Sequence, residues 1–168
     1  MIDNIQRNII RFFILVLLQV LVLNNIQLSG FLNPYVYVLF IIILPFETPG
    51  WLVLILGFMI GFSVDIFSNT LGINAAATVA MAFARQHLLK TLAPRGGFDL
   101  NASPDIHTNG IFWFTKYSFL LIIIHHIYLF YLAVFSFQFF FKTLFLSIMN
   151  AIITCGIIVL SQYISRKR

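Results

Sequence analysis

Six apolar runs, divided by charged residues and turn formers, constrain the fold of this chain more than any other feature of its sequence. They cover Phe12 to Leu28, Leu32 to Phe46, Trp51 to Phe67, Leu71 to Leu89, Tyr117 to Phe137 and Thr143 to Ile164. A helix needs about 20 predominantly apolar residues to cross a bilayer. All but the second run are long enough, so we expect an all-α integral membrane protein with a single polytopic domain over residues 1–168.

The run from Leu32 to Phe46 is the exception because it is short. At about 1.5 Å per residue it would reach only roughly 22 Å as a helix. It must therefore thin the bilayer, use its flanking residues or turn back before it crosses. Turn-forming residues at 29–30 and 47–50 still separate it from its neighbours, so the sequence predicts about six transmembrane helices.

Composition agrees with a bilayer environment, since 61% of the residues are hydrophobic and only 9% are charged. The net charge of +5 could suggest nucleic acid binding, but the basic residues lie at the ends of the apolar runs and in one loop. We therefore expect no nucleic acid partner. Cys155 is the only cysteine, which excludes an internal disulfide and a cysteine metal cage.

The basic residues predict the topology, because Lys and Arg concentrate in cytoplasmic segments. Both termini and the central loop at 93–110 are rich in Lys and Arg, either within them or at their borders, so all three are expected in the cytoplasm. That arrangement needs an even number of membrane crossings before the loop and after it. Four crossings before the loop and two after it meet this condition. Lys142, on the opposite side, is the one basic residue that disagrees. The loop has little apolar surface, and we expect a mobile connection.

Small residues predict close packing of the third and fourth spans. Gly57 and Gly61 lie four residues apart on one helix face, the spacing that lets two helices approach closely. The next span carries alanines at the same spacing, at Ala76, Ala80 and Ala84. We expect these two faces to meet.

Asp65 lies on the same face as the glycines and is the only acid well inside an apolar run. A carboxylate there costs at least about 2.5 kcal/mol unless it is partnered. It could bind an ion, a proton or a partner protein. It could instead be structural, accepting hydrogen bonds from Ser68, Asn69 or Thr70, or from the first amides of the next helix. The structural alternative is favoured by its position near the outer interface.

Candidates for catalysis or metal binding are weak. His125 and His126 are adjacent, so on a helix they point about 100° apart and cannot hold one metal from one face. They are expected to be neutral and hydrogen bonded between helices. The sequence has no Gly-x-Ser-x-Gly motif, no glycine-rich phosphate loop, no His-Glu-x-x-His motif and no pair of aspartates inside the apolar runs. We therefore expect no enzyme activity, no cofactor and no metal site.

The segment from Gly57 to Gly72 resembles the signature of the bacterial rod shape-determining protein MreD family. The matching residues are Gly57, Phe58, Gly61, Asp65, Ser68, Leu71 and Gly72. The small size, the basic ends and Asn33-Pro34-Tyr35 before the second span are similar too.

The resemblance implies a non-enzymatic membrane scaffold of the elongation machinery in the bacterial inner membrane. It would partner MreC, and through it MreB, RodA and a penicillin-binding transpeptidase. It also implies a six-helix fold similar to the substrate-binding components of energy-coupling-factor transporters. A vitamin-binding component of such a transporter is the alternative function. The run from Phe12 to Leu28 contains no Ala or Gly, however, which disfavours the helix docking typical of those components.

Overall fold

The computed structural model describes residues 2–26, 33–94, 96–99, 102–136 and 138–165, and these ranges contain helices and no β-strand. In chain order the helices are α1 Ile2–Leu21, η1 Leu23–Asn25, η2 Val36–Val38, α2 Leu39–Ile42, α3 Gly50–Ser68, α4 Ile73–Thr91, α5 Ile106–Asn109, α6 Ile111–Val134 and α7 Phe140–Ile164. Among the described residues, four segments are long and apolar enough to cross a membrane: Gln6–Asn25, Gly50–Ser68, Ile111–Val134 and Phe140–Ile164. The expected all-α membrane fold is confirmed at this level.

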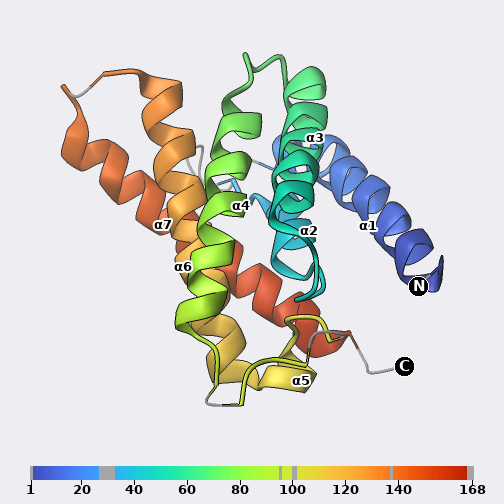
Figure 1. The fold of residues 1–168 in the computed structure, drawn as a ribbon. Coiled ribbons are helices and arrows are strands. Elements are labelled where there is room, and N and C mark those ends of the chain that lie inside the picture. The colour runs from blue at the N-terminus through green and yellow to red at the C-terminus, as the bar shows by residue number, and fades with distance from the viewer. Residues whose placement is uncertain (1, 27–32, 95, 100–101, 137, 166–168) are drawn as a thin grey trace.

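Within the bundle, α1 and α3 run in the same direction, and from α3 onward the long helices alternate in direction (Figure 1). Both chain ends and α5 lie at one end, which we call the terminal end, and the α3–α4 and α6–α7 turns lie at the other, the turn end. At the terminal end, His107 Nε2 lies 3.0 Å from the carbonyl oxygen of Ser165. The amino terminus, the central loop and the carboxyl terminus therefore share one end of the molecule.

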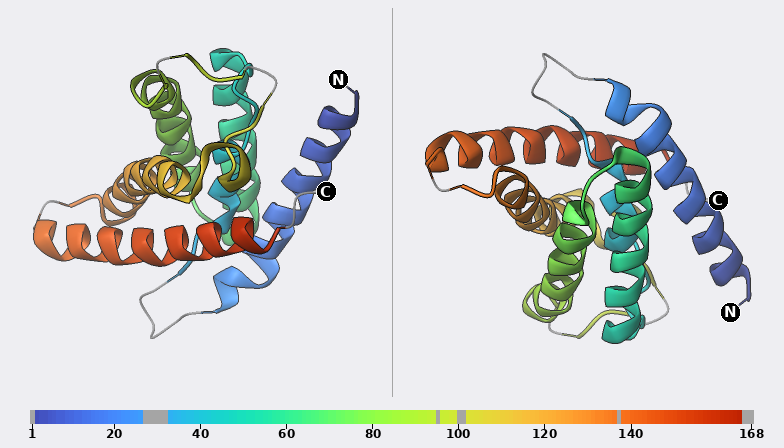
Figure 2. Two further views of the ribbon diagram at one scale, coloured as in Figure 1. Left: turned by 90° about the horizontal axis from the view of Figure 1, so that it is seen from below. Right: turned by 90° about the horizontal axis from the view of Figure 1, so that it is seen from above.

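The expected fourth span, Leu71 to Leu89, forms α4, but α4 is less apolar than the four candidate membrane helices. Its position explains this composition, since α4 packs between α3 and α6 (Figure 2). Asn74, Thr78 and Arg85 are buried on its protein-facing sides. A helix enclosed by protein can carry polar residues that lipid would exclude.

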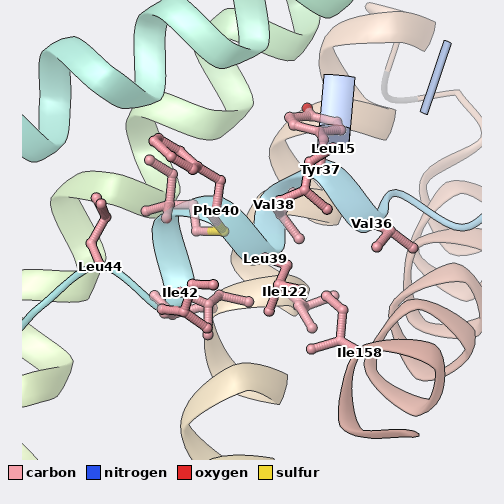
Figure 3. Close-up of a cluster of buried hydrophobic side chains, with 14 of the residues drawn as sticks. Leu15, Val36, Tyr37, Val38, Leu39, Phe40, Ile42, Leu44, Ile122 and Ile158 are labelled. Carbon is pink, nitrogen blue, oxygen red and sulfur yellow. The ribbon is translucent and has the colours of Figure 1, made fainter. Parts of the chain in front are cut away.

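The second apolar run departs most from the expectation of a spanning helix. Its described part folds into η2 followed by the single turn of α2, with irregular chain on either side. The segment runs through the interior of the bundle, where Tyr37, Val38, Ile41 and Ile42 are fully buried. Side chains from α1, α6 and α7 surround it, and Figure 3 shows Leu15, Ile122 and Ile158 around it. We call residues 33–45 the inner segment.

The central loop at 93–110, which the sequence predicts to be a mobile connection, is described except at residues 95, 100 and 101. Its described part folds against the bundle: the Phe98 ring stacks on Phe46 with centroids 4.2 Å apart, and the Phe46 amide donates to the Ala102 carbonyl at 3.1 Å. The loop also contains α5, where the Asp105 side chain accepts a hydrogen bond from the Thr108 amide at 2.6 Å. Aromatic contacts and one helix cap thus connect the described part of the loop to the bundle.

Candidate functional site

The residues of the signature come together where α3 ends, turns and continues into α4. Asn69 closes α3 with a left-handed backbone at φ 52°, and Gly72 precedes α4 with φ 80°. A Cβ at Gly72 would meet no atom within 4 Å, so space does not require glycine there. The positive φ favours glycine at this position, because residues with a side chain rarely adopt that backbone conformation. We call this helix–turn–helix unit, with Gly57, Gly61 and Asp65, the α3–α4 joint.

The two glycines of α3 let its backbone touch α4, as expected. A Cβ added at Gly61 would lie 2.6 Å from Ala75 Cα and 2.7 Å from the Asn74 carbonyl oxygen. At Gly57 the space is less restricted, with Ala82 Cβ at 3.1 Å and the Thr78 carbonyl oxygen at 3.3 Å. Gly61 is therefore the tighter of the two contacts.

The α4 side of this contact differs from the expected alanine face. Ala76 is exposed, and Ala80 and Ala84 are half-buried. Asn74, Ala75, Thr78 and Ala82 meet α3 instead. Small residues do form the contact, as the four-residue spacing predicts. The small residues of α4 that pack against α3 lie one or two positions along the sequence from the expected alanines, however, and so on a different face of the helix.

Asp65 is buried, with 3% of its surface exposed, and its carboxylate faces the start of α4. Its Oδ1 accepts hydrogen bonds from the Thr70 hydroxyl, from the Asn74 amide at 3.1 Å and from the Asn74 side chain at 3.0 Å. Its Oδ2 accepts one from the Ala75 amide at 2.8 Å. Gly72, at the N-cap position of α4, has no side chain to do this. Asp65 therefore caps α4 from the preceding helix.

This arrangement matches the structural alternative for Asp65. The first amides of a helix lack partners within it and carry partial positive charge, so a carboxylate there is stabilised. Four donors also satisfy a charged group that would otherwise be costly away from water. The capping donors are Thr70 and the amides of α4, whereas Ser68 faces elsewhere.

The remaining signature residues have separate surroundings. The Ser68 hydroxyl accepts a hydrogen bond from the Asn24 side chain at 2.8 Å and so ties the joint to η1, the short helix that follows α1. Leu71, in contrast, is 99% exposed at the tip of the turn. Its side chain contributes nothing to packing within the described chain, although it belongs to the same sequence signature.

Sequence reasoning missed the polar network that extends from the joint into the bundle. The Tyr37 hydroxyl donates to Asn74 Oδ1 at 3.2 Å, and lies 3.1 Å from the Thr78 hydroxyl and 2.8 Å from His125 Nε2. These side chains come from the inner segment, α4 and α6. A chain of hydrogen bonds thus runs from Asp65 through Asn74 and Tyr37 to His125.

Further polar side chains satisfy the irregular backbone of the inner segment. Gln19 Nε2 donates to the Pro34 carbonyl at 3.1 Å, and Thr154 Oγ1 accepts from the Tyr35 amide at 3.1 Å. Asn150 Oδ1 accepts from the Asn33 amide at 2.8 Å.

The last residues of the inner segment are satisfied by two other side chains. The Tyr117 hydroxyl donates to the Ile42 carbonyl at 3.1 Å. The buried Arg85 guanidinium donates to the Leu44 and Pro45 carbonyls. Non-helical backbone is tolerated at membrane depth only when protein satisfies its polar groups. These scattered polar residues therefore make a broken second segment possible. In the sequence, the sign of this network was the presence of single polar residues within the apolar runs.

The two histidines are hydrogen bonded between helices, as expected. His126 Nε2 lies 3.2 Å from the Thr154 hydroxyl of α7, and its Nδ1 lies 2.9 Å from the Ile122 carbonyl oxygen. His125 meets Tyr37, so the two rings serve different neighbours. Among the described residues, no group of three or more His, Cys, Asp or Glu side chains could hold a metal ion.

Comparisons with protein-family models, curated proteins and solved structures found no match to this chain. The geometry of the α3–α4 joint and of the inner segment therefore carries the functional argument.

Proposed function

We propose that this chain is a non-enzymatic membrane scaffold of the MreD type, acting in the elongation machinery of a bacterial inner membrane. The observation that carries the proposal is the capped α3–α4 joint. Three of the residues that resemble the MreD signature, Gly57, Gly61 and Asp65, are engaged in a helix–helix contact and a helix cap, which are structural roles. In this role the chain would bind MreC, and through it MreB, RodA and a penicillin-binding transpeptidase, to maintain rod shape.

The proposal includes a topology in which the chain crosses the membrane six times. The four apolar helices, α4 and the inner segment would be the crossings, with the inner segment shielded from lipid by the rest of the bundle. The terminal end would face the cytoplasm, where Arg7, Arg11 and the basic carboxyl terminus place it by the positive-inside rule. A bundle of this kind would be similar in architecture to the substrate-binding components of energy-coupling-factor transporters.

The filled interior supports a scaffold over the transporter alternative. A small-molecule site is usually a concave pocket enclosed by the protein. Here the inner segment occupies the interior of the bundle with fully buried side chains. A cavity of about 810 Å³ lies instead at the side of the bundle, between α1 and α3, and is lined mainly by apolar side chains.

Leu71 is the signature residue best placed to contact a partner. Its side chain is exposed at the turn end, while Ile66 and Phe67 are exposed on the last turn of α3. Exposed apolar side chains on a structurally fixed turn can dock an apolar partner surface. The joint would thus position Leu71, and Asp65 would keep the turn in one conformation.

Co-purification tests the proposal. The chain would be expressed with MreC from the same genome, extracted in a mild detergent and isolated through a tag on the chain. We expect MreC to co-elute with the wild type and with Gly156→Ala, a substitution at an exposed site with free space around it. Absence of MreC beside a monodisperse, normally accumulating chain would contradict the proposal.

A further inference from the structure

The geometry around the buried Tyr37 hydroxyl shows where the protons of its hydrogen bonds lie. A tyrosine hydroxyl has one proton to donate. The Tyr37 oxygen nevertheless lies close to polar atoms of three buried side chains: Asn74 Oδ1 at 3.2 Å, Thr78 Oγ1 at 3.1 Å and His125 Nε2 at 2.8 Å. A single proton cannot serve all three, so at least one of these neighbours must donate to Tyr37.

The orientation of the Asn74 amide is set by the carboxylate of Asp65. Asn74 Nδ2 donates to Asp65 Oδ1 at 3.0 Å and to the Thr70 hydroxyl oxygen at 3.1 Å. The reversed amide would place Asn74 Oδ1 beside the carboxylate, where two acceptors would repel each other. Asn74 Oδ1 therefore faces Tyr37, and as an acceptor it needs the proton of the Tyr37 hydroxyl.

The Thr78 hydroxyl also acts as an acceptor toward Tyr37. Its own proton is used in a hydrogen bond to the Asn74 carbonyl oxygen at 2.7 Å. Because a threonine hydroxyl has one proton, its oxygen can then only accept from Tyr37. With Asn74 and Thr78 both accepting, His125 is the neighbour that donates, through a proton on Nε2.

The second ring nitrogen of His125 supports the same assignment. His125 Nδ1 is buried and has no hydrogen-bond partner within the part of the chain that the structure describes. A proton on Nδ1 would be a buried donor without an acceptor, which is rare in proteins. If Nδ1 carried the proton, Tyr37 would donate to Nε2, and Asn74 Oδ1 would lose its donor as well. A proton on Nε2 alone leaves one group unpaired instead of two.

The adjacent His126 requires the opposite arrangement. Its Nδ1 lies 2.9 Å from the Ile122 carbonyl oxygen, which can only accept, so Nδ1 carries the proton. Its Nε2 then accepts from the Thr154 hydroxyl at 3.2 Å. The Thr154 oxygen in turn accepts from the Tyr35 amide at 3.1 Å. His126 is thus linked to Tyr35 of the inner segment, as His125 is linked to Tyr37.

We propose that His125 and His126 are both neutral, carry their protons on opposite ring nitrogens, and that His125 is a positioning residue for the α3–α4 joint. His125 donates to Tyr37, Tyr37 to Asn74 and Asn74 to Asp65, so every donor in this chain points toward the carboxylate. Hydrogen bonds in a chain polarise one another, and a charged acceptor strengthens them. The chain therefore couples α6 and the inner segment to the cap of α4. This coupling is independent of the proposed scaffold function.

Nitrogen NMR of the full chain in lipid bilayers tests the proton positions. Histidine labelled with nitrogen-15 would be used at neutral pH, where protonated and unprotonated ring nitrogens give separate signals. The two residues can be assigned without a variant, because His126 is the one histidine in the sequence that follows another. We expect the proton on Nε2 of His125 and on Nδ1 of His126. A proton on Nδ1 of His125, or protons on both of its nitrogens, would overturn the assignment.

Two substitutions test the coupling to the joint. Tyr37→Phe removes the acceptor of His125, and Asp65→Asn removes the charge at the end of the chain. Both should move the Nε2 proton signal of His125 upfield, with the smaller shift for Asp65→Asn, and leave the ring signals of His126 in place. Gly156→Ala, at an exposed site, should move neither. An unchanged His125 signal in Asp65→Asn, or equal shifts of both histidines, would overturn the coupling.

A matched pair of variants at position 125 tests the donor itself. The side-chain amide of His125→Gln can place a donor near the position of Nε2, whereas His125→Met has a similar length and no donor. We expect the thermal midpoint of the detergent-solubilised chain to stay near the wild type for His125→Gln and to fall for His125→Met. A midpoint for His125→Met equal to or above that of His125→Gln would overturn the positioning role.

Discussion

Gly61→Ala is the substitution whose effect follows most directly from the α3–α4 contact. The new Cβ would lie 2.6 Å from Ala75 Cα, whereas carbon atoms pack at about 3.5–4.0 Å. The helices must therefore separate locally by about 1 Å, which would stretch the 2.8 Å hydrogen bond from the Ala75 amide to Asp65 beyond bonding distance. Overpacking costs about 1–3 kcal/mol, and a hydrogen bond to a charged group contributes about 1.5–3 kcal/mol. We expect a total destabilisation of about 2.5–6 kcal/mol.

Two other glycines provide matched comparisons for Gly61. At Gly57 the nearest atom to a new Cβ is the Ala82 side chain at 3.1 Å, so we expect a loss of only about 1 kcal/mol. At Gly156, an exposed helical position, a Cβ meets nothing within 4 Å. There alanine should be neutral, or stabilise the helix by about 0.5–1 kcal/mol.

Heating the detergent-solubilised variants and measuring the monodisperse fraction by size-exclusion chromatography would rank their stabilities. The reasoning predicts Gly156→Ala at or above the wild type, Gly57→Ala slightly below and Gly61→Ala far below. Equal midpoints for Gly61→Ala and Gly156→Ala would refute the close approach of α3 and α4.

Four further predictions address separate parts of the chain. Gly61→Leu should reduce membrane accumulation more than Leu54→Ala, since the larger residue forces the helices apart; equal immunoblot levels would remove the packing argument. Tyr117→Phe should lower the thermal midpoint by an amount equivalent to about 1–3 kcal/mol, because the Ile42 carbonyl loses its buried donor; an unchanged midpoint would contradict that role. Leu71→Ser should leave accumulation unchanged but reduce co-purified MreC, and undiminished MreC would exclude Leu71 from the interface. A cysteine at Asn101, in a Cys155→Ser background, should be labelled in inverted vesicles and not in intact spheroplasts, and efficient labelling of spheroplasts would reverse the topology.

The long helices were predictable because their physical signal is local. Apolar length between turn formers located α3, α6 and α7 to within a few residues at most boundaries, although α6 begins at Ile111, before the expected Tyr117. The glycine spacing and the intramembrane carboxylate located the α3–α4 joint. Its donors, Thr70 and the α4 amides, were among the alternatives that the sequence left open.

The inner segment could not be predicted in the same way. Its irregular backbone depends on Gln19, Asn150 and Thr154, which are far from it in sequence. Hydropathy alone predicts a short helix for such a segment, because a local sequence pattern contains no information on hydrogen bonds to residues far away in the chain. For the same reason the alanine spacing in α4 did not reveal which of its small-residue faces packs.

Cell shape after exchange of Asp65 tests the central claim, that this chain is a scaffold in which the carboxylate is structural. The host gene would be replaced by Asp65→Asn or Asp65→Leu, with chain levels in the membrane measured beside cell dimensions. Asparagine keeps the shape and one acceptor oxygen, so we predict largely rod-shaped cells, whereas leucine removes the α4 cap and should give rounded cells, as should deletion of the gene. Rods after deletion would contradict the scaffold function. A stably inserted Asp65→Asn chain in rounded cells would instead show that the charge itself is needed, contrary to a structural role.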